Sequence, residues 1–167
     1  MYGAVHLLTH KTTGAPFVAK IMKLEAQNDT WAEERRVKRV LKSARNEATV
    51  LGELDHPNIS RLVDIYTDED HFVMVQEWCA GGDLFHQIIS RDFFSERDAA
   101  RVIKELLVAV DYLHSRNICH RDIKAENIIC QSNQVKLIDF GLACKYDPEK
   151  GMNGYAGTRT YMSPEML

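Results

Sequence analysis

The feature that most constrains the fold is a change in the character of the sequence at Gly81 and Gly82. Before these glycines, short β-branched runs alternate with polar turns, whereas after them most apolar residues recur at helical spacing. Paired glycines between segments of different periodicity are typical of a connection between structural units. The 167-residue chain is therefore predicted to hold a small strand-rich lobe followed by a helical one.

The strand-rich part predicts four strands around one long helix. Residues 4–8 and 17–23 are short, apolar runs separated by a turn-like segment, which is typical of a hairpin, and two further strands are expected at 59–66 and 71–78. Residues 31–54 carry apolar side chains three and four positions apart among many charges, which indicates an amphipathic helix. A docking face and a solvated helix face both remain open for its basic residues, Arg35, Arg36, Lys38, Arg39, Lys42 and Arg45.

The helical part begins with a short helix expected at 83–90. A longer helix is predicted from Ser95, a favourable N-cap, to about Arg116, and short strands are predicted at 128–129 and 135–138. The segment 144–157 is rich in Gly, Lys, Asp and Asn, which predicts a loop.

Charge and composition narrow the classes of partner. There are 21 basic and 24 acidic side chains, giving a formal charge of −3, so nothing in the balance favours nucleic acid. The start of the chain lacks the basic flank and apolar core of a signal peptide, and no apolar run approaches the length of a membrane span. The expected protein is intracellular, cytoplasmic and soluble, with neither a nucleic acid nor a membrane as partner.

The four cysteines are scattered, without the spacing of a zinc site. A reducing compartment is the simplest interpretation, and Cys79, Cys119 and Cys130 are interpreted as small buried apolar residues. The position of Cys144 in the predicted loop leaves its role open.

Two short motifs carry the chemistry. Residues 120–127 read His-Arg-Asp-Ile-Lys-Ala-Glu-Asn, and residues 139–141 read Asp-Phe-Gly. This combination resembles the protein kinase family. Three further segments agree in order: Val18-Ala19-Lys20 resembles the strand with the phosphate-binding lysine, Glu47 falls on the partner helix, and Ser163-Pro164-Glu165 resembles the end of the activation segment.

The resemblance implies an α+β, protein kinase-like, two-lobed fold. A small antiparallel β-sheet lobe with one long helix would occupy 1–80, and an incomplete helical C-terminal lobe would occupy 81–167, up to the end of the activation segment. We expect one protein kinase domain over 1–167, truncated at both ends, because only Gly3 and Val5 match the glycine-rich loop and because the family continues into further helices.

The resemblance also assigns catalytic roles. Lys20 would contact the α- and β-phosphates of ATP, oriented by Glu47. Asp122 would accept or orient the proton of the acceptor hydroxyl, and Lys124 would steady the transferring phosphate. Asn127 and Asp139 would hold Mg²⁺, which prefers oxygen ligands, and would complete the catalytic set.

The nucleotide site implied by the resemblance draws on both lobes. Glu77 to Cys79 resembles the hinge that reads adenine, Asp83 falls where an acidic residue binds the ribose, and Gln76 would guard the back of the pocket. The residues expected to bind the nucleotide are Gly3, Val5, Val18, Lys20, Gln76, Glu77, Cys79, Asp83, Glu126, Asn127, Ile129 and Asp139. In addition, Leu51, Leu62, His120 and Phe140 match the apolar column that couples the lobes of active kinases.

The implied activity is ATP- and Mg²⁺-dependent transfer of the γ-phosphate to serine or threonine hydroxyls of proteins. Lys124, and Gly157 with Thr158, resemble the serine/threonine branch. The segments 79–85 and 113–118 are similar to the calcium/calmodulin-regulated and calcium-dependent group, which implies substrates with basic flanks, favoured by Asp83 and Glu126, and a regulatory protein or segment outside this chain. Two alternatives stay open: a catalytically impaired kinase-like binding or regulatory module, and a small-molecule phosphotransferase.

Overall fold

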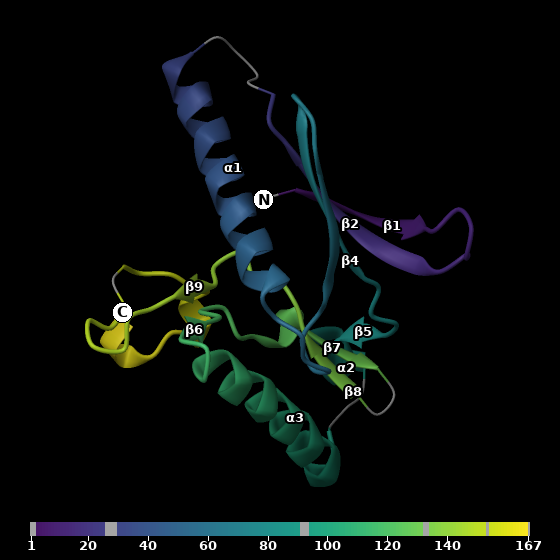
Figure 1. Cartoon of the computed structure of the whole chain (residues 1–167). Helices are drawn as coiled ribbons and strands as arrows, with labels where there is room; N and C mark the ends of the chain where they lie inside the picture. Colours follow the sequence, from purple (N-terminus) through teal and green to yellow (C-terminus); the bar gives the residue numbers. More distant parts are fainter. Residues whose placement is uncertain (1–2, 26–29, 91–93, 132–133, 153, 167) are drawn as a thin grey trace. The chain divides into compact units, whose positions relative to one another are not determined.

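The computed structural model describes residues 3–25, 30–90, 94–131, 134–152 and 154–166 (Figure 1). The predicted domain range 1–167 and the predicted loop 144–157 therefore include positions outside the described residues. The described chain forms two compact units. One comprises the described residues of Met1–Glu53 and Arg61–Trp78, and the other those of Leu54–Ser60 and Cys79–Leu167. The predicted lobe boundary between residues 80 and 81 stays a prediction.

The first unit is an antiparallel sheet with one helix packed on a face (Figure 1). Its strands lie in the spatial order β1-β2-β4-β3. The elements are β1 (Ala4–Thr9), β2 (Pro16–Lys23), α1 (Trp31–Gly52), β3 (Leu62–Thr67) and β4 (His71–Glu77). The predicted hairpin and helix are confirmed, and α1 ends two residues before the predicted end.

Helix α1 begins where the sequence provides a cap. The Thr30 hydroxyl accepts a hydrogen bond from the Glu33 N–H, and Glu33 and Glu34 place negative charge in the first turn, where it complements the helix dipole. The apolar face of α1 packs on β2 and β4, and burying each large side chain there stabilises the unit by about 1.5–3 kcal/mol. The buried cluster consists of Met22, Ala44, Ala48, Phe72 and Met74.

The opposite face of α1 is basic and exposed. Of the basic residues singled out from the sequence, Arg36 pairs with Glu33 at 2.7 Å, and the Arg35 guanidinium lies 4.3 Å from the centre of the Trp31 ring. The exposed members are Arg35, Lys38, Arg39, Lys42 and Arg45. Both interpretations of this face, docking and solvation, stay predictions.

The predicted start of the third strand is wrong. Strand β3 begins at Leu62, whereas Ile59 is buried and forms an isolated parallel bridge with Leu137 in the second unit. The Ser60 N–H donates to the Leu137 carbonyl at 2.9 Å, and the Leu137 N–H donates to the Asn58 carbonyl at 2.8 Å. An apolar residue between two polar ones reads as strand by alternation alone, and its distant partner cannot be inferred from that pattern.

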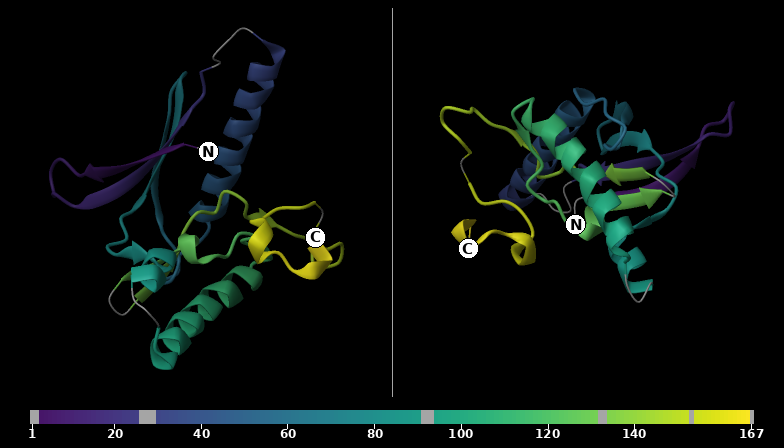
Figure 2. Two further views of the ribbon diagram at one scale, coloured as in Figure 1. Left: turned by 180° about the vertical axis from the view of Figure 1, so that it is seen from behind. Right: turned by 90° about the horizontal axis from the view of Figure 1, so that it is seen from below.

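The second unit combines two helices with short strand pairs. The β7-β8 hairpin lies beside the longer helix, α3 (Figure 2). Its elements are β5 (Gly82–Asp83), α2 (Leu84–Ser90), α3 (Glu96–His114), β6 (Ile118–Cys119), β7 (Ile128–Gln131), β8 (Gln134–Leu137) and β9 (Cys144–Lys145), with short 3₁₀ turns at Ala125–Asn127, Arg159–Tyr161 and Pro164–Met166. The predicted helices and the strands β7 and β8 are confirmed, except that Asp83 belongs to β5 rather than to the short helix and Ile138 lies outside β8; β5, β6 and β9 were not predicted.

Helix α3 anchors the second unit. The Ser95 hydroxyl accepts from the Asp98 N–H at the N-terminus, as the sequence predicts. In mid-helix, one Glu105 carboxylate oxygen accepts from the Val135 N–H at 2.6 Å and from the Asn58 side chain at 2.9 Å, so α3 is tied to β8 and to residues 54–60. Among the described residues, no helix combines the length and apolar composition that crossing a membrane requires.

Candidate active site

In the first unit, a lysine on a strand meets a glutamate on the helix. The Lys20 ammonium of β2 lies 2.7 and 2.9 Å from the two carboxylate oxygens of Glu47. The glutamate is one turn from Ala44 and Leu51 on the face of α1 that packs on the sheet, which explains why a charged side chain is only 4% exposed. The predicted pairing is therefore present in the structure, although its role in catalysis stays a proposal.

The strand register gathers four of the predicted nucleotide residues on one face of the sheet. Val5 lies opposite Lys20, and Val18 lies opposite Gln76. Directly opposed residues, and residues two apart on one strand, project from the same face. Val5, Val18, Lys20 and Gln76 therefore share the face on which α1 packs.

Gly3 precedes this face in a conformation that favours glycine. Its φ is +154°, and a Cβ atom at this position would lie 2.7 Å from the Ile21 carbonyl oxygen. At the other end of the sheet, Glu77 exchanges hydrogen bonds with the backbone of Arg61: its N–H donates to the carbonyl, and its carboxylate accepts from the N–H at 2.9 Å. The Glu77 side chain is thus fixed within the first unit.

In the second unit, the Asp122 carboxylate lies at the centre of a hydrogen-bond network. The Thr158 hydroxyl donates to one carboxylate oxygen at 2.6 Å. The Lys124 ammonium and the Asn127 amide reach the other at 2.9 and 3.0 Å. Lys124 also donates to the Thr158 hydroxyl at 2.9 Å, so the lysine, the threonine and the aspartate contact one another in a closed triangle.

These contacts set the ionisation of Asp122. Burial raises the pKa of this carboxyl, but the hydrogen bonds from Thr158 and Lys124 outweigh burial and leave the pKa below its usual value. The same contact with Asp122 raises the pKa of Lys124. At neutral pH Asp122 is therefore ionised and Lys124 is charged. An ionised carboxylate can accept a hydrogen bond from a hydroxyl and so orient it, next to the positive charge of the lysine.

His120 holds the loop that carries Asp122 through contacts with two backbone groups. Its Nδ1 accepts from the Asp122 N–H at 3.2 Å and its Nε2 faces the Ile138 carbonyl at 3.1 Å, so only the neutral Nε2–H tautomer satisfies both partners. Burial lowers the pKa of His120, which agrees with this form. The ring also contacts Phe140 edge to face, with centroids 4.7 Å apart, and both side chains are buried.

Asn127 and Asp139, the two predicted Mg²⁺ ligands, each lie next to a residue that His120 contacts: Asn127 contacts Asp122, and Asp139 follows Ile138. The Asn127 side chain uses its N–H groups on Asp122, at 2.9 Å to the carbonyl and 3.0 Å to the carboxylate, so its amide oxygen is the atom that could ligate a metal. The Ile138 N–H donates to the Asn127 carbonyl at 2.9 Å, and this bond fixes the backbone just before Asp139. Asp139 itself has a φ of 59° and is exposed. An amide oxygen and a carboxylate are ligands that Mg²⁺ accepts, so this donor set fits the ion.

The described residues include no group of three or more His, Cys, Asp and Glu side chains arranged to hold a metal. The two predicted ligands, Asn127 and Asp139, therefore differ from an all-protein metal cage. Sites for Mg²⁺ commonly use one or two protein oxygens together with substrate phosphates.

The remaining predicted nucleotide residues lie on the short strand β5, on its neighbour β7 or in segments next to them. Asp83 lies opposite Ile129 of β7, so both side chains share one face of that sheet. The Asp83 carboxylate accepts from the His86 N–H at 2.8 Å and contacts the His86 ring at 2.8 Å, which lowers the pKa of Asp83. Glu126 is exposed and accepts from the Tyr161 hydroxyl at 3.3 Å, and Cys79 is half-buried where the chain passes into the second unit.

Sequence reasoning did not assign a site role to Thr158. Gly157 brings the threonine to Asp122: its φ is +129°, and a Cβ atom there would lie 2.8 Å from the Arg121 carbonyl oxygen. The Gly-Thr pair was visible in the sequence as a mark of substrate class. Only the structure shows its hydroxyl as a partner of both Asp122 and Lys124.

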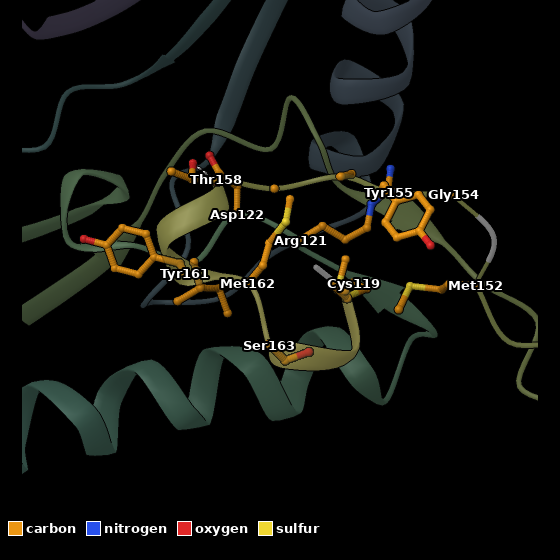
Figure 3. Close-up of a pocket in the computed structure, with 14 residues that line it drawn as sticks. Cys119, Arg121, Asp122, Met152, Gly154, Tyr155, Thr158, Tyr161, Met162 and Ser163 are labelled. Atoms are coloured by element: carbon orange, nitrogen blue, oxygen red, sulfur yellow. Dashed lines mark hydrogen bonds between the residues drawn. The ribbon is translucent and has the colours of Figure 1, made fainter.

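A pocket of about 580 Å³ opens beside this network (Figure 3). Asp122 and Thr158 lie at one end, with the side chains of Cys119, Met152 and Met162 along the wall. An ionised carboxylate at the end of a partly apolar pocket can position a polar group of a bound peptide.

A strand lysine paired with a helix glutamate, together with a loop aspartate held by a lysine and an amide, is typical of enzymes that transfer phosphoryl groups from nucleotides. The chain matches the family model described as protein kinase domain over residues 1–167, and it belongs to this family. The predicted family and the predicted α+β, kinase-like fold class are thereby confirmed.

The relatives agree with the predicted subgroup. Calcium/calmodulin-dependent protein kinase type II of Caenorhabditis elegans is 38% identical over 99% of this chain and 22% of the relative. Calcium-dependent protein kinase 4 of Plasmodium falciparum (isolate 3D7) is 35% identical over 99% of this chain and 31% of the relative, and myosin light chain kinase 3 of Homo sapiens is 32% identical over 99% and 19%. The chain thus spans less than a third of the length of these relatives.

Proposed function

We propose that this domain transfers the γ-phosphoryl group of ATP to serine or threonine hydroxyls of protein substrates. The observation that supports this most strongly is the Asp122 carboxylate, held by Lys124, Asn127 and Thr158 at one end of a pocket. If one of these partners were another residue type or pointed away from Asp122, an impaired binding module would be the better interpretation.

In this proposal, Asp122 orients the acceptor hydroxyl and takes its proton as the oxygen–phosphorus bond forms and ADP leaves. Because its pKa is lowered, the carboxylate is a weak base, and proton transfer would come late, when the hydroxyl has become acidic through bond formation. Lys124 lies 2.9 Å from Asp122 and would stabilise the charge on the transferring group. Thr158 fixes both side chains.

The first unit would supply the nucleotide contacts. Lys20, held by Glu47 at 2.7 Å, would bind the α- and β-phosphates, and Val5, Val18 and Gln76 share the sheet face of Lys20. In the second unit, Asn127 and Asp139 would hold Mg²⁺, which when bound neutralises charge on the phosphates. We propose that both sets of residues act on one nucleotide.

Substrate class and regulation extend the proposal. The contact of Lys124 with Thr158 supports a serine/threonine acceptor, and the acidic Asp83 and Glu126 support basic residues before it. A peptide array with basic, neutral and acidic flanks tests this preference; equal use of acidic flanks would contradict it. The names of the relatives refer to calcium and calmodulin, which supports a regulatory protein or segment outside this chain. A cytoplasmic location stays a prediction.

The deciding experiment measures transfer of labelled γ-phosphate from ATP to a serine- and threonine-containing protein substrate. Wild-type full-length protein is compared with Asp122→Asn, which keeps the shape of the side chain and removes its charge. We expect kcat to fall about 10²- to 10⁴-fold, the range for loss of a positioned acid–base group.

The matched control is Asp111→Asn, the same change at an exposed position of α3. It should leave kcat unchanged. If the wild-type protein bound ATP and transferred no phosphate, the domain would be a kinase-like binding or regulatory module instead. If Asp122→Asn kept full activity, another group would have to position the acceptor.

A further inference from the structure

Two cysteines face each other across the ladder of β6 and β9. Cys119 and Cys144 are direct partners in this antiparallel pair, and neither is in a disulfide. Opposed residues project from the same face, with Cα atoms about 4.5 or 5.5 Å apart depending on the type of pair. Both separations fall within the range of about 4.4–6.8 Å found across disulfides. The ladder therefore holds the two thiols at a distance that a bond can close.

A second observation connects both cysteines to the pocket: Cys119 lines it, and Cys144 contacts Met152, which also lines it. The Cys144 Sγ lies 3.9 Å from the Met152 Sδ, and Cys119 and Met152 both line the pocket described above (Figure 3). Both cysteines are half-buried. A small reagent can therefore reach the pair, whereas a fully buried thiol would be protected.

We propose that Cys119 and Cys144 form a reversible disulfide by exchange with a small-molecule disulfide such as oxidised glutathione. One protein thiolate attacks a glutathione sulfur, a protein–glutathione bond forms, and one glutathione thiolate leaves. The other protein thiolate then attacks the protein sulfur of this mixed disulfide and expels the second glutathione. Two protein thiols are oxidised, one glutathione disulfide is reduced to two thiols, and the two protons pass to the glutathione thiolates.

The order of attack follows from the surroundings of Cys119. Burial and the neighbouring Cys144 raise the pKa of the Cys119 thiol, and the nearby Arg121 only partly opposes them. Cys119 therefore has a small thiolate fraction at neutral pH. We assign the first attack to Cys144 and the resolving attack to Cys119, and the resolving step should accelerate as the pH rises and Cys119 ionises.

The disulfide would close a loop that contains the proposed catalytic residues of the second unit. Asp122, Asn127 and Asp139 all lie between Cys119 and Cys144. A cross-linked β6–β9 ladder cannot separate until it is reduced, so any rearrangement of the following segment that needs this separation would be blocked. Disulfides in reducing compartments are commonly transient and regulatory, which is the character expected of this one.

The test is a disulfide map of the native full-length protein in glutathione redox buffers that contain a metal chelator. Trypsin places each of the four cysteines in a different peptide: 62–91, 117–121, 125–136 and 137–145. After an acid quench and alkylation of the remaining thiols, mass spectrometry should find 117–121 joined to 137–145 as the main linked pair. We expect at least about tenfold more of this pair in native protein than in protein denatured by urea, because folding holds the thiols together.

Serine variants assign the bond. Cys144→Ser should abolish the link, whereas Cys79→Ser should leave it unchanged. The proposal would be overturned if glutathione remained on Cys144 without a 119–144 link, if links to Cys79 or Cys130 dominated, or if native and denatured protein gave equal yields. The map requires no kinase activity, so it can fail or succeed independently of the proposed function.

Discussion

The two units hold their charged side chains by different means. In the first unit, Lys20 and Glu47 meet because strand register and helix period place them opposite each other. In the second unit, Asp122 is held by Lys124, Asn127 and Thr158 along irregular backbone. Regular structure thus fixes one pair through many repeated backbone bonds, whereas the loop needs several side-chain bonds to fix a single carboxylate.

The irregular backbone of the second unit also contains strained residues. Asn117, Arg121 and Asp139 have φ values of 56°, 63° and 59°, in the region that side chains other than glycine rarely adopt. Residues of this kind persist where the surrounding contacts determine their conformation, and they are common at functional sites. For Arg121, one such contact is the bond from its Nε to the Leu142 carbonyl at 2.7 Å.

This difference predicts which substitutions are most damaging. Lys20→Met removes one partner of a pair in which Glu47 is 4% exposed, and so leaves a buried carboxylate without its cation. We expect the free energy of unfolding to fall by about 3 kcal/mol. We also expect kcat/KM for ATP to fall about 10²- to 10³-fold, the range for loss of a preorganised charge contact.

The control for this change is Lys23→Met, at an exposed position on the same strand. It should change both quantities little. Urea unfolding and steady-state kinetics measure the two effects. If Lys20→Met unfolded no more easily than Lys23→Met, the ion pair would not stabilise the first unit.

The close approach of Gly157 to the backbone of Arg121 gives the next largest effect. Gly157→Ala adds a Cβ atom 2.8 Å from the Arg121 carbonyl oxygen and should push Thr158 away from Asp122. We expect kcat to fall about 10- to 100-fold, since small misplacements of positioning groups are costly. Gly154→Ala is the matched control: its φ is also positive, at +92°, but no atom lies within 4 Å of the added Cβ. If kcat fell equally in both variants, backbone strain at the positive φ would explain the effect, and the close approach to Arg121 would not.

A milder change tests the network itself. Thr158→Val removes the hydroxyl but keeps the branched shape, while Asp122 retains Lys124 and Asn127. We expect kcat to fall about tenfold, as for loss of a hydrogen bond to a charged group. Because the Thr158 hydroxyl lowers the pKa of Asp122, its loss should raise that pKa and move the acidic limb of the pH–rate profile to higher pH. Thr158→Ser should restore both, whereas an unshifted limb in the valine variant would contradict this account.

The smallest expected effect concerns pH and stability. The pKa of His120 is lower in the folded chain than in the unfolded chain, so the unfolded state binds the proton first as the pH falls. Its contribution to stability is complete above the unfolded pKa of about 6.5 and is lost as the pH drops from there towards the lower folded value. Between about pH 7.5 and 5.5, the free energy of unfolding of His120→Phe should therefore fall less than that of the wild-type protein, as measured by urea unfolding.

His56, whose pKa is also lowered by burial, should maintain part of the pH dependence in that variant. A His56→Phe change made alone gives the second reference slope. An identical slope in wild type and His120→Phe would show that His120 does not titrate with unfolding.

The same contrast explains what the sequence could predict. Apolar periodicity was sufficient for α1 and α3, because each repeats one pattern over many residues, and short apolar runs on either side of a turn were sufficient for β1 and β2. The two-residue strands β5, β6 and β9 are too short to carry a pattern, and the partner of Ile59 is 78 positions away at Leu137. In the loops, only the resemblance to a family identified Asp122 and Asp139, since irregular backbone has no periodic signal.

Contacts between side chains far apart in the chain were the hardest to predict. The bond from Thr158 to Asp122 joins residues 36 positions apart and depends on the conformation of Gly157. The contact of Asp83 with His86 is local and was not predicted, and the nucleotide role that the resemblance implies for this carboxylate stays a prediction. A polar residue three positions after an aspartate at a helix start could have suggested this contact.

The central claim is the proposal that Lys20, Asp122, Asn127 and Asp139 act on one bound nucleotide. The most direct measurement is an experimental structure of the full-length protein with Mg²⁺ and a non-hydrolysable ATP analogue. We predict that Lys20 contacts the α- or β-phosphate, that Asn127 and Asp139 supply oxygens to the ion, and that Asp122 faces the γ-phosphate. A bound nucleotide that leaves Lys20 and Asp139 facing different cavities would contradict this claim.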